Sequence, residues 1–208
     1  MNSASDLMPL FAYFLGSIPV GWIVARLFFK TDIRSKGSGN IGATNALRQF
    51  GTAVGLIVLL LDMSKGIIAV LLAKSIYGSG AMMVVICGLL AILGHVFPIW
   101  LKFKGGKGVA TAAGVFIALT PISLLIALLV FIVVVAITRY VSLGSIMAAL
   151  SLLAVNVISI FRQPHKDYAL LILVVLIVAM IIYKHKENIA RLIRGNENKI
   201  SLTGKGKA

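Results

Sequence analysis

Long apolar runs separated by short polar stretches dominate this sequence. Each run is about 16 to 22 residues long, which lets a helix cross the ~30 Å hydrocarbon core of a bilayer. The pattern therefore predicts an all-α, polytopic integral membrane protein with a single transmembrane domain over residues 1–208. The predicted spans are residues 7–29, 53–74, 82–101, 141–161 and 168–183, and a longer apolar stretch covers residues 109–138.

The stretch 109–138 can be counted as one crossing or as two. It is broken at Thr120-Pro121, and a tight turn at Pro121 gives seven transmembrane helices. The basic loops and a basic cytoplasmic tail, residues 184–208, then share one side of the membrane, whereas a single crossing moves the tail to the other side. Because cytoplasmic loops retain Lys and Arg, we predict seven helices, with the N-terminus outside and the C-terminus cytoplasmic. Residues 109–119 are too short to span alone, so they must start in the preceding loop or form a buried half-helix.

The charge balance is strongly basic, with 20 Lys and Arg against 6 Asp and Glu in 208 residues. These basic residues lie in short loops and a tail rather than on a face interleaved with aromatic residues, so they do not predict nucleic-acid binding. They favour retention at the cytoplasmic face of a membrane, beside anionic lipid. Cys87 is the single cysteine and lies in an apolar run, so neither a disulfide nor a cysteine metal site is expected.

Two glycine-rich polar stretches interrupt the apolar pattern. The first cradle, Asp32–Gly51, lies in the predicted cytoplasmic loop 30–51, and the second cradle, Phe103–Thr111, lies in the predicted cytoplasmic loop 102–111. Glycine lets backbone N–H groups close around an anion, and hydroxyls, amides and cations add contacts to phosphate. We predict that both cradles bind a phosphate or a similar oxyanion, the alternative being flexible connectors. The candidate ligands are Gly37, Ser38, Gly39, Asn40, Thr44, Asn45 and Arg48 in the first cradle, accompanied by Arg34 and Lys36, and Lys104, Gly105, Gly106, Lys107 and Gly108 in the second.

Nucleotide-binding motifs do not account for these cradles. Gly37-x-Gly39-x-x-Gly42 matches the dinucleotide fingerprint, but no β-strand pattern precedes it and no βαβ unit surrounds it. The run 104–108 resembles a phosphate loop in composition but lacks the G-x-x-x-x-G-K-[ST] pattern. Nucleotide hydrolysis is therefore not predicted.

Two charged residues lie near the middle of the second predicted span. Asp62 and Lys65 are three residues apart on a helix, so they share a face and can pair. Charged groups at membrane depth are costly and normally face the protein interior. The pair could neutralise itself and anchor the helix, or Asp62 could orient a residue of the first loop while Lys65 faces an anion. His95, near the end of the third span, is interpreted as a hydrogen-bonded packing residue.

Two polar residues mark the point where the last span ends. His185 and Asn188 are three apart, hence on one helical face, and on the same predicted side of the membrane as the cradles; an interfacial polar pair is the alternative. His165 falls in a predicted outer loop and is not expected to take part. The cytoplasmic side offers no close pair of carboxylates for Mg²⁺, no G-x-S-x-G elbow and no histidine followed five residues later by aspartate. We therefore expect no metal and no cofactor.

Four motifs in order resemble a known enzyme family. They are G-S-I-P, then D-I-R-S-K-G-S-G-N-I-G-A-T-N-A-L-R-Q-F-G, then G-H-V-F-P with F-K-G-G-K-G-V-A-T, and finally H-K-E-N-I-A-R-L-I-R-G-N-E. Over nearly the whole chain, and with matching spacing, the sequence is similar to the bacterial acyl-phosphate-dependent glycerol-3-phosphate acyltransferases.

The resemblance implies a seven-helix enzyme of the bacterial cytoplasmic (inner) membrane with its active site facing the cytoplasm. Its partners would be acyl phosphate, glycerol 3-phosphate and membrane lipid, and its products lysophosphatidic acid and phosphate, in phospholipid synthesis. By motif position, Ser38 and Arg48 would contact one substrate phosphate, and Lys107 with its glycine neighbours would hold the other. Ser145, His185 and Asn188 resemble the remaining polar residues of the site, and His185 and Asn188 are taken with Ser38, Arg48 and Lys107 as the catalytic set.

Three other functions compete with this interpretation. A transporter or channel for a phosphorylated solute would need polar residues across the membrane, but the outer halves of the spans are nearly pure Leu, Ile, Val and Ala. A lipid phosphatase would act without an acceptor alcohol. A structural lipid-binding protein would not need two cradles.

Overall fold

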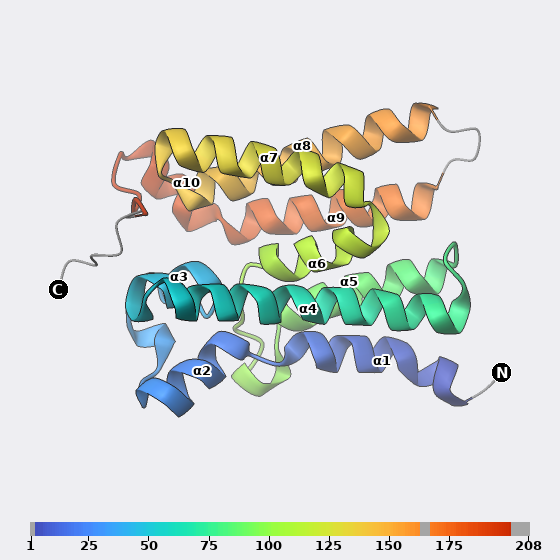
Figure 1. Ribbon diagram of the computed structural model, residues 1–208, viewed down its shortest axis with the longest axis horizontal. Coiled ribbons are helices and arrows are strands. Elements are labelled where there is room, and N and C mark those ends of the chain that lie inside the picture. Colours follow the sequence, from blue (N-terminus) through green and yellow to red (C-terminus); the bar gives the residue numbers. More distant parts are fainter. Residues whose placement is uncertain (1–2, 163–166, 201–208) are drawn as a thin grey trace. The chain divides into compact units, whose positions relative to one another are not determined.

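In the computed structural model, residues 3–162 and 167–200 are described, and within these residues every regular element is helical. Figure 1 shows them in chain order. Confirming the all-α prediction, the α-helices are α1 (Ser3–Ser17), α2 (Val20–Phe29), α3 (Ala43–Phe50), α4 (Thr52–Tyr77), α5 (Met82–Val96), α6 (Val109–Leu119), α7 (Pro121–Thr138), α8 (Val141–Arg162), α9 (Tyr168–Lys184) and α10 (Lys186–Ile193), with short 3₁₀ turns at Ile33–Ser35 and Ile99–Leu101.

The helices have the length and composition of membrane spans. Thr52–Tyr77, Met82–Leu101, Pro121–Thr138 and Val141–Arg162 are each long and apolar enough to cross a bilayer, and counting the bent pairs α1–α2 and α9–α10 as one span each raises the number to six. The protein is therefore a helical membrane protein. The count of seven and the orientation of the termini stay predictions, as does the single transmembrane domain.

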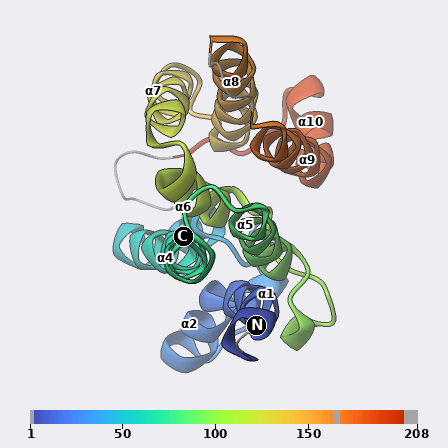
Figure 2. The same cartoon turned by 90° about the vertical axis from the view of Figure 1, so that its right-hand side faces the viewer.

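The chain forms two compact units, and residues 3–119 make up the first. In this unit α4 is the central helix, with α1, α3, α5 and α6 packed around it, while α5 also packs along α1 (Figures 1 and 2). Glycines permit the closest approaches. A Cβ at Gly114 of α6 would lie only 1.9 Å from the Met63 carbonyl oxygen of α4, and one at Gly66 only 2.3 Å from the Thr111 carbonyl oxygen. The α4–α6 contact is thus made backbone against backbone, as small residues allow in membrane helices.

The first predicted span is a broken helix. Pro19 has no N–H and interrupts the backbone ladder, so α1 ends at Ser17 and α2 starts at Val20 with a bend of 42°. The break leaves carbonyl groups that need donors at membrane depth. Lys65 of α4 supplies them, because its Nζ donates to the carbonyl oxygens of Gly16 (3.1 Å) and Ile18 (2.9 Å).

The second unit contains the described residues from Thr120 to 200. In it α7 and α8 form an antiparallel hairpin and α9 packs on α8 (Figure 1). The break expected at Thr120-Pro121 is present, since α6 ends at Leu119 and α7 starts at Pro121. Proline is favourable at a first helical position, where its missing N–H has no helical partner to lose.

Two segments predicted as irregular contain helices. In the loop 30–51, residues 43–50 form α3, because this part has no glycine and buries one face through Asn45 and Ala46. In the tail 184–208, residues 186–193 form α10, which buries Asn188. The glycine-rich composition of the loop 30–51 and the basic composition of the tail 184–208 made both segments look irregular in the sequence. His165 and the tail residues 201–208 lie outside the described residues.

The α4–α6 contact generates a stability prediction. Gly114→Ala forces a methyl group into the Met63 carbonyl, and overpacking of this kind costs about 1–3 kcal/mol or more. We expect a clearly lower midpoint of thermal unfolding in detergent micelles. Gly80→Ala is the matched control, since a Cβ there meets open space. Equal midpoints for the two variants would contradict the close contact.

Candidate anion-binding site

The first cradle is folded around the side chain of Asn45, which is 1% exposed. Its Nδ2 donates to the carbonyl oxygens of Ile33 (3.1 Å), Lys36 (3.2 Å) and Asn40 (2.8 Å). Its Oδ1 accepts a hydrogen bond from the Ser38 N–H (3.1 Å). An amide offers two donor hydrogens and two acceptor lone pairs, so most of this capacity holds the loop rather than a ligand. The structure therefore gives Asn45 a role in shaping the cradle.

Other predicted ligands in this cradle also hold its shape. The Asn40 Oδ1 accepts from the Gly42 N–H (2.9 Å), which closes a turn just before α3. Gly37 and Gly39 have φ of +60° and +69°, a region that favours glycine. A Cβ at Gly37 would also lie 2.3 Å from the Asn45 Oδ1. These three residues thus explain the turn itself, and the hydroxyl of Ser38 stays exposed at its tip.

Helix α3 carries the remaining candidates, Thr44 in its first turn and Arg48 in its last turn. The two are four residues apart, so they share a face of α3. Both are half-buried, whereas Asn45 and Ala46 are buried. A helix N-terminus presents N–H groups without helical partners and a positive partial charge, which favours an anion. Thr44, Arg48 and the N-terminus of α3 are therefore the candidate anion-binding groups of the first cradle.

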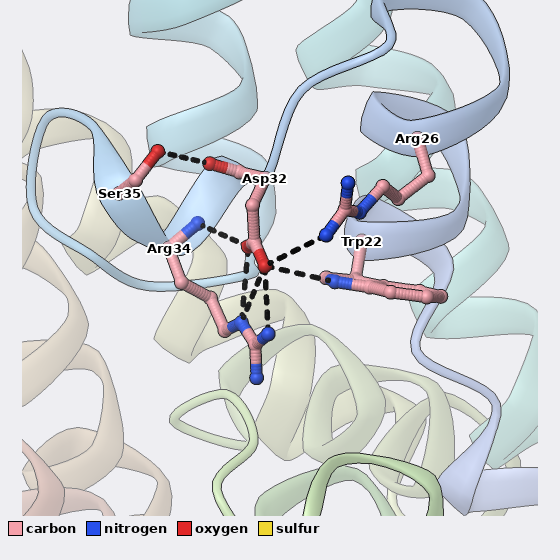
Figure 3. A network of polar contacts seen from close by, with 5 residues as sticks. All are labelled: Trp22, Arg26, Asp32, Arg34 and Ser35. Carbon is pink, nitrogen blue, oxygen red and sulfur yellow. Dashed lines mark hydrogen bonds and ion pairs between the residues drawn. The ribbon is translucent and has the colours of Figure 1, made fainter.

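Sequence reasoning missed an aspartate that ties α2 to this cradle (Figure 3). The Asp32 carboxylate accepts from the Arg34 Nη2 (2.7 Å) and from the Trp22 Nε1 (3.4 Å), and lies 3.6 Å from a guanidinium nitrogen of Arg26. The hydrogen bond from Arg34 holds the pKa of Asp32 well below its usual value. Arg34, interpreted from the sequence as a cation of the cradle, thus has its charge directed at Asp32. An Asp two residues before an Arg in a tight turn was the available signal.

The second cradle uses most of its backbone donors for its own fold. The Gly105 N–H donates to the Val96 carbonyl (3.2 Å) and the Gly106 N–H to the His95 carbonyl (3.1 Å), so these groups cap the end of α5. A Cβ at Gly105 would lie 2.2 Å from the His95 carbonyl oxygen, which explains the glycine by packing. The N–H groups of Gly105 and Gly106 are therefore not free to bind an anion, contrary to the sequence expectation.

The donors that remain in the second cradle lie where α6 starts. Gly108 has φ of +82°, and its carbonyl accepts the first helical hydrogen bond, from the Ala112 N–H (2.8 Å). The N–H groups of the first turn of α6 have no helical partners. Lys107 directly precedes this turn and is half-buried, while Lys104 is exposed. The candidate anion-binding groups of the second cradle are thus Lys107 and the N-terminus of α6.

Both helix N-termini lie against the same face of α4. Gly55 contacts Leu47 of α3, and Gly66 contacts Thr111 of α6. Eleven residues correspond to about three helical turns, so Gly55 and Gly66 share a face of α4. Figure 1 shows that α3 runs back along α4 and that α6 runs in the same direction as α4. Counting 1.5 Å per residue, the two N-termini face each other about 8 Å apart along the α4 axis.

The second unit holds its own buried polar cluster. The Asn188 Nδ2 (2.7 Å) and the Ser142 hydroxyl (3.0 Å) donate to Oε1 of Glu197, and the Arg191 Nε (2.7 Å) donates to Oε2. Burial would raise the pKa of Glu197, but the hydrogen bonds from Asn188, Arg191 and Ser142 outweigh it and hold that pKa below the usual value. Sequence reasoning identified Asn188 but missed its partners.

His185 and Ser145 belong to the same unit. The His185 side chain is 2% exposed, and its Nδ1 lies 2.8 Å from the Ile181 carbonyl oxygen. A carbonyl only accepts, so Nδ1 carries a proton. The Ser145 hydroxyl donates to the Val141 carbonyl (2.9 Å) of its own helix.

Known proteins include relatives of this chain. A family model described as glycerol-3-phosphate acyltransferase matches residues 7–195. The chain belongs to the glycerol-3-phosphate acyltransferase family. Its family relatives include the glycerol-3-phosphate acyltransferase of Trichlorobacter lovleyi, 53% identical over 188 residues that cover 90% of this chain and 93% of the relative. Glycerol-3-phosphate acyltransferase 2 of Bacillus anthracis is 44% identical and covers 92% of this chain and 96% of its own.

Solved structures of the family have the same fold. The crystal structure of PlsY (YgiH), an integral membrane glycerol 3-phosphate acyltransferase in its glycerol 3-phosphate form, matches with a TM-score of 0.87 at 40% identity, covering 96% of each chain. The lysophosphatidic acid form of PlsY matches with a TM-score of 0.84 at 38% identity, covering 97% of this chain and 98% of that one.

The Asn45 hub leads to a prediction about the first cradle. Asn45→Ala removes a buried amide and leaves three carbonyls and one N–H without this partner, each loss costing about 1–3 kcal/mol if the group stays buried. We expect amide hydrogen exchange across residues 33–45 to accelerate at least about tenfold, since 1.4 kcal/mol is a factor of ten. Thr44→Ala is the control, because the Thr44 hydroxyl is not part of the Asn45 hub. Unchanged exchange in Asn45→Ala would show that the hub does not hold the loop.

Proposed function

We propose that the protein transfers an acyl chain from acyl phosphate to the 1-hydroxyl of glycerol 3-phosphate, releasing lysophosphatidic acid and phosphate. The observation that carries the proposal is the pair of helix N-termini on one face of α4, with Arg48 on α3 and Lys107 before α6. Both reactants contain a phosphate, so two neighbouring anion sites fit them. One reactant is a lipid, which fits a site built on membrane helices.

Charge neutralisation is the main task of such a site. Two dianions 8 Å apart repel each other by about 2 kcal/mol in water and by about 8 kcal/mol at an effective dielectric constant of 20. Arg48, Lys107 and the two helix N-termini offset this repulsion with fixed positive charge. The two reactants are then held side by side, and such orientation is worth about 7–11 kcal/mol of a reaction barrier.

The chemical step needs little further activation. The hydroxyl oxygen of glycerol 3-phosphate forms a bond to the acyl carbonyl carbon, and the bond from that carbon to the phosphate oxygen of the mixed anhydride breaks. The proton of the hydroxyl passes to a phosphate oxygen of a substrate, so no side-chain base, metal or cofactor takes part. Fixed donors directed at the carbonyl oxygen stabilise the charge that develops there.

Roles can be assigned to the site residues on this basis. Ser38, Thr44 and Arg48 bind one phosphate, and Lys107, Gly108 and the first turn of α6 bind the other, assisted by Lys104. Asn45, Asn40, Gly37 and Gly39 shape the first cradle, as Gly105 and Gly106 shape the second. From the family resemblance we also propose that Ser145, His185 and Asn188 contact substrate, with Glu197 orienting the Asn188 amide.

The same proposal includes a topology. Seven spans with the N-terminus outside and the C-terminus cytoplasmic put both cradles at the cytoplasmic face of the bacterial inner membrane. The basic loops and tail then lie on the side that the positive-inside rule favours. Glycerol 3-phosphate reaches this site from the cytoplasm.

The reaction is tested by mixing purified protein in detergent with palmitoyl phosphate and glycerol 3-phosphate in the presence of EDTA. We expect lysophosphatidate and inorganic phosphate in equal amounts, because neither a metal nor a separate base is used. Phosphate release without the acceptor alcohol would instead indicate a lipid phosphatase. Uptake of labelled glycerol 3-phosphate into liposomes without any acyl product would indicate a transporter.

The guanidinium of Arg48 is predicted to be irreplaceable by an amine. Arg48→Lys keeps the charge but loses the planar fork that binds two phosphate oxygens at once. We expect kcat/KM to fall about tenfold or more, since a hydrogen bond to a charged group is worth about 1.5–3 kcal/mol. Lys36→Arg, an exposed charge-conserving change in the same cradle, is the matched control. Equal activity of Arg48→Lys and wild type would remove Arg48 from the site.

His185→Ala separates positioning from base catalysis. If a substrate phosphate takes the proton, the variant loses substrate affinity, seen as a raised KM, and keeps measurable turnover at saturation. Steady-state kinetics together with equilibrium binding of glycerol 3-phosphate measure both effects. A variant that binds both substrates normally and yet has no turnover would make His185 the general base.

A further inference from the structure

Three charged or titratable side chains meet in the interior of the first unit: Asp62, Lys65 and His95. They are 1%, 3% and 5% exposed. The Lys65 Nζ donates to the carbonyl oxygens of Gly16 (3.1 Å) and Ile18 (2.9 Å), and it forms an ion pair with the Asp62 carboxylate (2.7 Å). The ammonium is therefore held by groups of the protein.

The same carboxylate faces His95. Oδ1 of Asp62 lies 3.5 Å from the His95 Nδ1. The Lys65 Nζ lies 3.3 Å from the same nitrogen. The Nδ1 side of the ring is thus held by the Asp62–Lys65 pair, and Nε2 is directed away from this pair.

The Nε2 edge of this ring lies directly against the second cradle. A Cβ built at Gly106 would fall 2.1 Å from Nε2 and 2.9 Å from Cδ2 of His95. The imidazole thus occupies the space that any side chain at Gly106 would need. Gly106 also donates its N–H to the His95 carbonyl, so ring and backbone of one residue hold the same glycine.

We propose that His95 is a positioning residue for the second cradle: the Asp62–Lys65 pair fixes its ring, and the ring edge sets the path of Gly106 so that Lys107 and the N-terminus of α6 reach the phosphate. The expected effect of His95 on KM rests on the proposed function. The contact between the imidazole and Gly106 rests on the geometry alone.

Loss of the His95 ring is expected to affect substrate binding at the second cradle and not at the first. The chain passes from Gly106 through Lys107 into α6 within three residues. A shift of Gly106 displaces the second anion site and leaves the first cradle, which is held by Asn45, in place. Loss of the His95 ring is therefore expected to raise KM for the substrate bound at the second cradle several-fold, with KM for the other substrate within twofold of wild type. A role in general packing would affect both.

A double-mutant cycle between His95 and Gly106 tests the steric part. Gly106→Ala alone is expected to lower the thermal midpoint in detergent, because its methyl group collides with the imidazole. His95→Ala removes the ring, so Gly106→Ala added to it is expected to cost little or nothing more. Residues in contact show such non-additivity, whereas independent residues give additive effects.

Gly105→Ala is the matched control for this cycle. Its Cβ would collide with the His95 carbonyl oxygen and with Pro98, neither of which His95→Ala removes. Its effect is therefore expected to add to that of His95→Ala. Additive effects for Gly106 as well as Gly105 would overturn the proposal.

The kinetic arm uses the single variant His95→Ala with both substrates titrated in turn. A rise in one KM with kcat within about threefold of wild type supports the positioning role, and equal rises in both, or no rise in either, contradict it. The two proposals fail separately. Wild-type protein that makes no lysophosphatidate refutes the proposed function, whereas the thermal cycle depends only on the contact between the imidazole and Gly106.

Discussion

The ion pair between Asp62 and Lys65 is the interaction on which the rest of the first unit depends. Two opposite charges buried among membrane helices are tolerated only when each has its partners, because isolated charges are expensive at this depth. Lys65 meets this condition by binding Asp62 and the two carbonyls at the break between α1 and α2. One side chain therefore joins the central helix to the broken first span.

The pair also explains how an aspartate can lie next to two anion sites. Gly55 and Asp62 are seven residues apart on α4, about two turns, so Asp62 shares the face against which α3 and α6 pack. An unpaired carboxylate there would oppose any phosphate. With Lys65 beside it, the local charge cancels, and the positive ends of α3 and α6 dominate the potential at their N-termini.

The family relation and the contacts in the structure explain different things about the chain. Family membership comes from a match over residues 7–195 and from relatives that cover about nine-tenths of the chain. The contacts within the first unit add a physical reason for the glycines. At Gly37, Gly105 and Gly106, a Cβ would collide with protein atoms. These glycines allow the close backbone packing of the two cradles, and we propose that the helix N-termini and their cations bind the anions.

The sequence predicted the helical membrane fold, the break at Thr120-Pro121 and the Asp62–Lys65 pair, because these follow from local rules of length, proline chemistry and helical spacing. It did not predict α3, because glycines on either side of residues 43–50 made the whole segment look irregular. Nor did it predict that Asn45, Gly105 and Gly106 use their polar groups within the fold. Whether a polar group binds a ligand or is used within the fold depends on which groups of other elements lie next to it. The amino-acid composition of a segment does not give this information.

The proposed reaction requires two phosphates bound side by side at the N-termini of α3 and α6. A crystal structure of the protein with glycerol 3-phosphate and a non-reactive acyl phosphonate tests this most directly. We expect one phosphorus atom beside Arg48 and Thr44 and the other beside Lys107 and the first turn of α6, roughly 8 Å apart along α4. Both phosphorus atoms at one cradle, or either one away from both N-termini, would contradict it.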